Sequence, residues 1–384
     1  MSDELNAGFN LNSLAVRAKN PSHLNSDKLD FLRGAAATYV VVNHVRGSFY
    51  AGGQAILAGP HNLFDTAAVG LLQLTALGAE AVVLFFVLSG FAMAHSVSKS
   101  RGAIGFYLRR LVRIWPPYIA ATLFALAVGR LVGIDAVARN LVRVLFYINP
   151  GVALVPQYWS LPFEVFFYLL CPLILASRRA VEIVAVVALV LTAVCVAFFG
   201  IGLNPTRHFL SDFFGNELLL FAFGAMAYYH LDRIPALSAR ALAAAATLLV
   251  LVAWAIKFRV GSSNLLSNLA MVSLALLAIR NLPDRLAAFR PLNWGFFSYS
   301  IYIFHYALIE VAHWSFRRAF GYEPLAIRNL FAWMLVVPAV IATWFLLYQI
   351  SERPSNIILT RLRRRGATAV SDPTLVPPAA IPRG

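Results

Sequence analysis

Three ionisable residues stand in stretches of sequence that are otherwise apolar. Arg33 and His44 lie in LDFLRGAAATYVVVNH, and Glu164 lies in QYWSLPFEVFFYLLCP. A charged group at the centre of a membrane helix costs about 2.5–3.5 kcal/mol, so such residues usually have a functional reason to be there. An imidazole and a carboxylate at the same depth can share a proton, which is the arrangement that general base catalysis requires. These residues therefore indicate a proton-transfer site.

The spacing of these residues predicts how they are arranged. Arg33 and His44 are separated by ten residues, which in an α-helix corresponds to about 16 Å along the axis and close to three full turns. Both side chains are expected on one face, with Arg33 near a membrane surface and His44 deeper. Glu164, on a helix of opposite direction, is expected at the depth of His44. Plainer roles stay open: Arg33 as an interfacial residue, His44 as a packing residue and Glu164 as half of a structural pair.

A basic segment, SVSKSRGAIGFYLRRLVRIWPPY, lies between two apolar stretches. Arg110 and Arg113 are three residues apart and share a helix face. Such a pair suits phosphate groups, and Arg109 and Lys99 are expected to assist. Anchoring of a cytoplasmic loop by positive charge explains the same cluster without a ligand.

Other polar residues in apolar stretches are weaker candidates for a pocket. Glu80 and Ser89 lie in LGAEAVVLFFVLSGF, and Glu80 is expected to be structural or pore-lining. His305 ends the apolar run FFSYSIYIFH, which also contains Tyr302. No stretch resembles a metal-ligand spacing, a phosphate loop or a nucleophile elbow, so no metal is expected.

The elements that carry these residues are apolar segments long enough to span a bilayer. The chain of 384 residues is 60% hydrophobic and only 13% charged, whereas soluble domains carry roughly 25% charged residues. The excess of Lys and Arg (32) over Asp and Glu (17) is explained by cytoplasmic loops, and nucleic-acid binding is not expected. We predict an all-α polytopic membrane protein with about ten transmembrane helices. Their expected ranges are 31–50, 67–95, 114–133, 158–176, 181–200, 214–231, 240–257, 264–281, 292–315 and 325–350.

The distribution of Lys and Arg over alternate loops predicts the orientation. The larger share falls in loops on the side of the N-terminus, which predicts that both termini lie in the cytoplasm. The expected location is the inner (cytoplasmic) membrane. Residues 1–28 are expected to be a polar lead-in and residues 29–354 the transmembrane domain. Residues 355–384 are expected to form a basic, then Pro-rich cytoplasmic tail without fixed structure.

Taken in order, these motifs resemble the membrane-bound acyltransferase-3 family. The matching stretches cover most of residues 29–354: LDFLRG followed by His44, FFVLSGF at 85–91, FYLRRLVRIWPPY at 106–118, YWSLPFEVFFY at 158–168, SYSIYIFH at 298–305 and SERP at 351–354. The chain departs from the pattern at Val83, where many relatives carry an acid or Pro. Glu80 is the residue that could take over a role there.

The resemblance implies transfer of an acyl group, often acetyl, from cytoplasmic acyl-coenzyme A to a hydroxyl of an acceptor. The acceptor is expected to be an envelope saccharide or a small secreted molecule, and acetyl-coenzyme A the donor. Arg33 and His44 are implied to be a functional pair, and Arg110 and Arg113 to be the partners of the coenzyme's phosphates. His44 is predicted to be the general base and Glu164 to orient it.

Three questions stay open at this point. Direct transfer and an acyl-histidine intermediate both fit the residues. A transporter or flippase of an envelope lipid or acyl group is the alternative function. A third possibility for the function is a catalytically inactive partner protein.

Overall fold

The computed structural model describes residues 26–49, 53–100, 102–175, 177–199, 209–261, 265–289, 294–321 and 328–360. All regular structure within these ranges is helical, which confirms the predicted all-α class. The longer helices are α2 (Ser26–Phe49), α4 (Leu63–Gln73), α5 (Gly78–Ser98), α6 (Ala103–Val132), α9 (Leu161–Ile174), α10 (Arg178–Phe199), α12 (Leu218–Tyr229), α13 (Ala239–Val260), α14 (Leu265–Asn281), α16 (Ser298–Phe320) and α17 (Arg328–Ile350).

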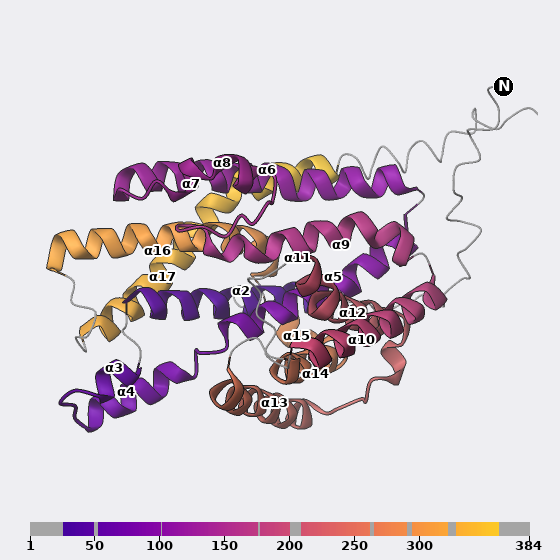
Figure 1. Ribbon diagram of the computed structural model, residues 1–384, viewed down its shortest axis with the longest axis horizontal. Helices are drawn as coiled ribbons and strands as arrows, with labels where there is room; N and C mark the ends of the chain where they lie inside the picture. Colours follow the sequence, from indigo (N-terminus) through magenta and orange to yellow (C-terminus); the bar gives the residue numbers. More distant parts are fainter. Residues whose placement is uncertain are drawn as a thin grey trace, which may run out of the picture.

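Shorter helical segments connect the long helices. They are α3 (Gly53–Leu57), α7 (Ala136–Arg139), α8 (Leu141–Leu145), the 3₁₀ turn η1 (Pro156–Ser160), α11 (Phe209–Asp212), the π-helical turn η2 (Phe213–Glu217), η3 (Leu231–Arg233), α15 (Asp284–Ala287) and η4 (Gly295–Phe297). Helices α2, α6, α9 and α16 run roughly along the long direction of the molecule (Figure 1). A further helix, Glu352–Thr360, extends past the boundary predicted at residue 354. The rest of the predicted lead-in and tail lies outside the described residues.

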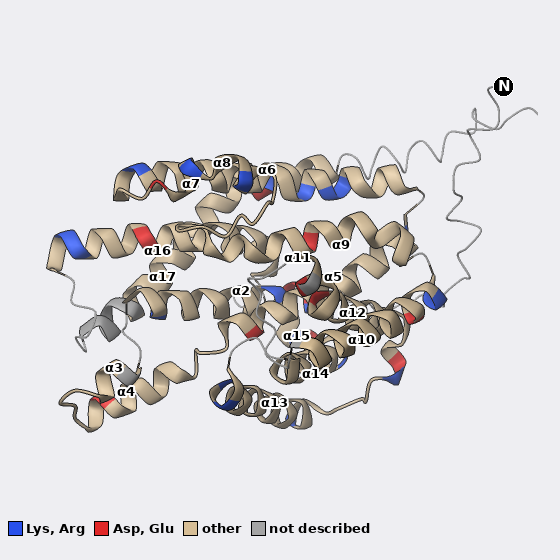
Figure 2. Ribbon diagram, viewed as in Figure 1, with Lys and Arg blue, Asp and Glu red and all other residues tan. Residues whose placement is uncertain are grey.

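Only some of the ten predicted spans correspond to helices that are long and apolar enough to cross a membrane. Four helices of the described ranges are long and apolar enough to cross a membrane: Leu63–Ser98, Ala103–Val132, Arg178–Phe198 and Ala239–Val260. A pair bent by 43°, Met334–Ile350 with Glu352–Thr360, would be a fifth. Each predicted segment contains a helix, but α9 has only 14 residues, or about 21 Å, against a hydrocarbon core of about 30 Å. Along the described helices charged side chains are few, as Figure 2 shows.

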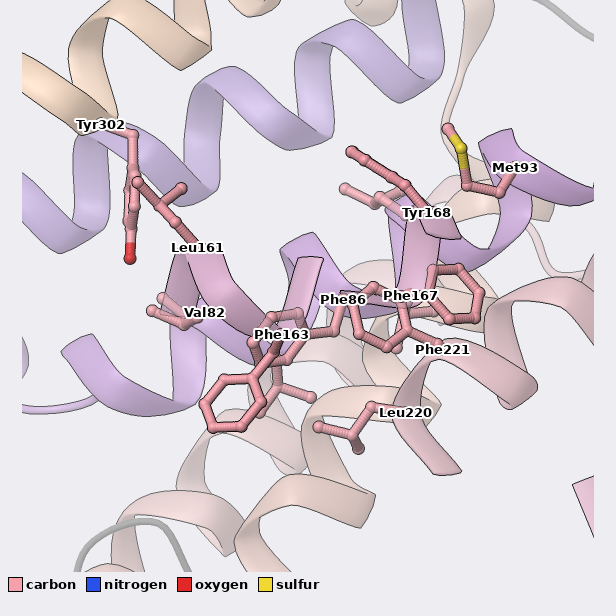
Figure 3. Packing of buried hydrophobic residues seen from close by; sticks show 14 of the residues in the cluster. Val82, Phe86, Met93, Leu161, Phe163, Phe167, Tyr168, Leu220, Phe221 and Tyr302 are labelled. Atoms are coloured by element: carbon pink, nitrogen blue, oxygen red, sulfur yellow. The ribbon is translucent and has the colours of Figure 1, made fainter. Parts of the chain in front are cut away.

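Helix α5 lies at the centre of the bundle. It packs against α2, α9, α12 and α14, and most of its 21 residues are buried. Figure 3 shows Val82 and Phe86 of α5 beside Phe163 and Phe167 of α9. A helix that is apolar and buried on all sides is typical of the core of a large helical protein.

Two glycines allow α5 and α12 to cross with their backbones in contact. A Cβ on Gly90 would lie 1.9 Å from the carbonyl oxygen of Phe221, and a Cβ on Gly224 would lie 1.9 Å from that of Val87. Small residues permit this close approach of membrane helices. Gly90 of the FFVLSGF motif therefore lets α5, the helix that carries Ser89, pack directly against α12.

The segment ahead of α9 folds back into the bundle. Leu154 and Val155 are almost fully buried, and Leu154 has a left-handed backbone with φ of 76°. The Tyr118 hydroxyl donates to the Val144 carbonyl at 2.5 Å and holds the start of this segment. Because these residues enter the interior, α9 begins at Leu161 inside the bundle and not at its surface.

Candidate functional site

A cavity between α2, α5, α6, α9 and α16 brings together the basic motifs of the sequence. Its volume is about 70 Å³. We call it the arginine cavity, after Arg33, Arg110 and Arg113. Its other polar lining residues are Ser89, Ser160, Glu164, Tyr168, Ser298, Tyr299 and Tyr302. Six of its lining residues are labelled in Figure 3, where Tyr302 and Met93 lie far apart: Val82, Phe86, Met93, Leu161, Tyr168 and Tyr302.

The guanidinium groups of the arginine cavity are only partly satisfied by protein contacts. Arg33 has long contacts to the Leu88 carbonyl, at 3.5 Å, and to the Asp30 carboxylate, at 3.7 Å. Arg110 donates to the Ser96 hydroxyl at 2.9 Å, and its buried Nε has no hydrogen-bond partner. Each guanidinium offers five donors, so the group as a whole can bind an anion such as phosphate.

The two auxiliary basic residues of the sequence prediction lie elsewhere. Arg109 donates to the Ser100 hydroxyl at 2.7 Å and does not line the arginine cavity. Lys99 caps the C-terminal end of α5 and is exposed. Both remain near the start of α6, outside the cavity.

Glu164 belongs to the arginine cavity and does not pair with His44. Its Oε1 accepts hydrogen bonds from the Ser89 hydroxyl, at 3.0 Å, and from the Tyr168 hydroxyl. The expected pairing of Glu164 with His44 is therefore wrong. The cause is the buried segment that precedes α9. Because this segment enters the interior, α9 begins inside the bundle, and Glu164 lies at the depth of Arg33 and not at the depth of His44.

An acidic residue of the SERP motif also supports this cavity. Glu352 is 4% exposed and accepts from the backbone N–H and the hydroxyl of Ser300, at 3.1 and 2.9 Å. It thereby satisfies the first turn of α16 with a carboxylate, which the helix dipole favours. Sequence reasoning quoted the motif without giving Glu352 a role. An acid directly after the long apolar segment 325–350 was the available signal.

A second cavity, of about 340 Å³, surrounds His44. We call it the histidine cavity. Its lining residues include Asn43, His44, Arg46, Ala79, Val82, Gln157, Trp159, Lys257 and Tyr302. Val82 and Tyr302 also line the arginine cavity, so the two cavities adjoin at these side chains. The Tyr302 hydroxyl is bonded to the Ser160 hydroxyl at 2.6 Å and to the Gln157 carbonyl at 2.8 Å.

The partner of His44 is His305. His44 Nδ1 lies 2.7 Å from His305 Nε2, and the rings are nearly parallel at 11°. His305 Nδ1 lies 2.8 Å from the Tyr302 carbonyl and 3.2 Å from the Ile301 carbonyl. A carbonyl can only accept, so the proton of neutral His305 is on Nδ1 and its Nε2 accepts from His44 Nδ1–H. This leaves a lone pair on His44 Nε2, the form that a general base needs.

Glu80 forms a buried ion pair. The Glu80 carboxylate is fully buried and lies 3.1 Å from Lys257 Nζ, which also donates to the Ala76 carbonyl. The pair joins α5 to α13, and Lys257 lines the histidine cavity. Glu80 thus has a structural contact at the wall of this cavity.

The fold is that of an all-helical membrane protein, and its described residues enclose two adjoining cavities. A family model described as an acyltransferase domain matches residues 26–349, and the chain belongs to this family, the membrane acyltransferase-3 family. The assignment made from the motifs is therefore confirmed. No similar protein was found among curated proteins, and no similar solved structure was found. Within the described ranges, no cluster of three or more His, Cys, Asp or Glu residues is placed to hold a metal ion.

Proposed function

We propose that this protein transfers an acyl group, acetyl in the first instance, from acyl-coenzyme A to a hydroxyl of an envelope saccharide or a small secreted acceptor. In this proposal ten helices cross the inner membrane, both termini are cytoplasmic, and the donor enters from the cytoplasm. The observation that carries the proposal is the contact of two unlike cavities at Tyr302. One is lined by three arginines and the other by a histidine in the tautomer of a base.

The donor binds in the arginine cavity. Arg110 and Arg113 bind phosphates of coenzyme A, and Arg33 binds a phosphate or the amide of the pantetheine arm. A cavity of about 70 Å³ accommodates the thioester end of the narrow arm but not the nucleotide, which remains toward Lys99 and Arg109. The thioester is thereby directed toward Tyr302. Glu164, held by Ser89 and Tyr168, partly neutralises the three guanidinium groups when no donor is bound.

The acceptor binds in the histidine cavity, where His44 acts as general base. His44 Nε2 takes the proton of the acceptor hydroxyl as its oxygen attacks the thioester carbonyl carbon. A carbon–oxygen bond forms, the carbon–sulfur bond breaks, and the coenzyme A thiolate receives the proton from the imidazolium. In the covalent variant His44 Nε2 itself attacks the thioester carbon, and the carbon–sulfur bond breaks to release the thiolate. The acceptor oxygen then displaces the imidazole from the acyl carbon, and the proton of the acceptor hydroxyl passes to the thiolate. His305 orients the imidazole in both variants.

The first experiment is acyl transfer in membrane vesicles. Labelled acetyl-coenzyme A is added on the cytoplasmic face, and label on an envelope fraction is compared between the wild type and His44→Ala. We expect label with the wild type only, with His44→Ala inserted at normal levels. A well-expressed His44→Ala protein with wild-type activity contradicts the mechanism.

The two cavities adjoin at Val82 and Tyr302, and this arrangement also favours a transporter or flippase as the second candidate. The same vesicles separate the two functions, because a transporter accumulates its substrate without consuming coenzyme A. Folded wild-type protein that releases no coenzyme A from any thioester, with a broad acceptor mixture present, would favour transport.

A further inference from the structure

A small recess opens beside the histidine cavity. It is lined by Ala79, Val82, Val83, Phe86, Trp159, Asp212, Asn216, Glu217, Leu220 and Asn268. Ala79, Val82 and Trp159 also line the histidine cavity, so the two spaces adjoin. The polar residues of this recess take no part in the mechanism above. We call it the carboxylate recess, after Asp212 and Glu217.

Glu217 has an unsatisfied carboxylate oxygen in this recess. The residue is 4% exposed, and its buried Oε2 has no hydrogen-bond partner. Its Oε1 accepts a long hydrogen bond, of 3.3 Å, from the amide of the neighbouring Asn216. A buried polar atom without a partner has lost its hydration with no hydrogen bond in return, and this is more unfavourable when the atom is charged. Glu217 Oε2 can therefore accept a hydrogen bond from a ligand group that enters the recess.

The local backbone explains how these residues reach one recess. Glu217 ends the π-helical turn η2, and π-helical turns occur frequently at functional sites. The Asn268 amide of α14 donates to the Asn216 side-chain oxygen at 3.3 Å and joins the second helix to this turn. Both asparagines are almost fully buried. Acceptors and amide donors thus line the same small space.

The size of the recess restricts what it can hold. Its volume is about 30 Å³, and a single water needs about 10–15 Å³, so it holds roughly two groups of the size of a hydroxyl. A sugar ring does not fit there. The adjoining histidine cavity, of about 340 Å³, does have room for one. Trp159 lies at the border of the two spaces, where an aromatic side chain can pack on the apolar face of a ring.

We propose that Glu217, Asn216 and Asn268 of the carboxylate recess recognise a second hydroxyl of a cyclic acceptor. The ring lies in the histidine cavity with one hydroxyl at His44, and a neighbouring hydroxyl enters the recess and donates to Glu217. Asn216 and Asn268 complete the contacts to this second hydroxyl. This inference rests on the proposed acyl transfer and narrows its acceptor to molecules with at least two hydroxyls on one ring.

The test combines acceptor analogues with a single substitution. Purified protein in lipid vesicles is given labelled acetyl-coenzyme A and a panel of methyl hexopyranosides, their monodeoxy analogues, a methyl aminohexoside and cyclohexanol. We expect transfer to at least one methyl hexopyranoside, and loss of one particular hydroxyl should raise the acceptor KM at least tenfold. In Glu217→Gln this difference should shrink to less than threefold, with the KM for acetyl-coenzyme A unchanged.

Controls separate recognition from folding. Glu182→Gln is the matched control, because this carboxylate on α10 pairs with Arg178 at 2.9 Å and does not line the recess. It should keep the wild-type discrimination among acceptors. If Glu217→Gln does not fold, Asn268→Ala is measured in the same way, with the same expected loss of discrimination.

Several outcomes overturn the inference while acyl transfer itself stands. One is that the protein acylates an envelope fraction but no methyl hexopyranoside. Another is that a folded Glu217→Gln protein keeps the full difference in KM between a hexopyranoside and its deoxy analogue. The third is that cyclohexanol is acylated as well as a hexopyranoside. A preference for the aminohexoside that depends on Glu217 would assign the recess to an ammonium group instead. Folded wild-type protein that releases no coenzyme A with any acceptor would instead contradict the proposed function.

Discussion

At the scale of single residues, the protonation state of His44 is determined by hydrogen bonds that begin at the backbone. The Tyr302 carbonyl accepts from His305, and His305 in turn accepts from His44. A neutral imidazole can orient another imidazole as a carboxylate does, but it adds no negative charge to stabilise the imidazolium. In the proposed mechanism His305 is thus a positioning residue, and its effect on the rate should be smaller than that of His44.

Substitutions of His305 test this assignment. His44→Ala should lower the transfer rate by about 10²–10⁴-fold, the usual contribution of a general base. His305→Ala should lower kcat by roughly tenfold or more without changing the KM for acyl-coenzyme A. His305→Gln should recover part of this loss, because its carbonyl oxygen can accept from His44 Nδ1–H. Equal kcat values for the Ala and Gln variants of His305, measured by coenzyme A release, would exclude the positioning role.

The arginines allow a second prediction at this scale. Arg113→Ala should raise the KM for acyl-coenzyme A by about 10–100-fold, because a hydrogen bond to a charged group contributes about 1.5–3 kcal/mol. Arg113→Lys should fall between this variant and the wild type, since it keeps the charge but loses the planar fork. Arg130→Ala, at the exposed end of the same helix, is the control. If Arg113→Ala reduces only the inserted amount of protein, membrane anchoring is the better explanation.

At the scale of helices, the α5–α12 crossing depends on the absence of two side chains. Gly90 and Gly224 each meet a carbonyl of the opposite helix, so an added methyl group must separate the helices. This separation would displace Ser89 and the wall of the arginine cavity. Packing at this crossing therefore affects function as well as stability.

Gly224→Ala should destabilise the protein by about 1–3 kcal/mol or more, the usual cost of overpacking a core. The measurement is the thermal unfolding midpoint in detergent. Gly70→Ala on α4 is the matched control, because nothing lies within 4 Å of a Cβ at that position. An unfolding midpoint of Gly224→Ala equal to that of Gly70→Ala would show that the crossing tolerates a side chain.

The sequence predicted the helices better than it predicted how they meet. Arg33 and His44 lie on one helix, α2, as their spacing predicted. The level of Glu164 was not predictable, because it depends on Leu154 in a left-handed conformation inside a segment that reads as an ordinary loop. His305 was identified only as a weaker candidate, since its contact with His44 joins positions 261 residues apart. Contacts of this kind follow from packing and leave no local pattern.

At the scale of the whole molecule, the two cavities lie one after the other along the bundle. Arg33 and His44, about 16 Å apart on α2, belong to different cavities. In the proposed orientation the donor and the acceptor therefore approach from opposite sides of the membrane. Neither reactant needs to cross the bilayer whole.

Sealed vesicles of known orientation test this arrangement. Acetyl-coenzyme A should support transfer when it is added to the face on the side of Arg33, and the acylated acceptor should appear on the other face. Added to the opposite face, it should give at most a few per cent of that rate, because the three arginines proposed to bind the donor, Arg33, Arg110 and Arg113, line the other cavity. Equal rates from both faces, in vesicles shown to be tight, would contradict the two-sided arrangement.

The hydrogen bond between Glu352 and the start of α16 has a consequence for biosynthesis. The arginine cavity needs Arg33 from the first described helix, and its α16 wall is capped by a residue close to the last one. A nascent chain that has inserted most of its helices thus still lacks the cap of this wall. If the arginine cavity binds acyl-coenzyme A as proposed, the complete donor site forms only after translation has passed residue 352.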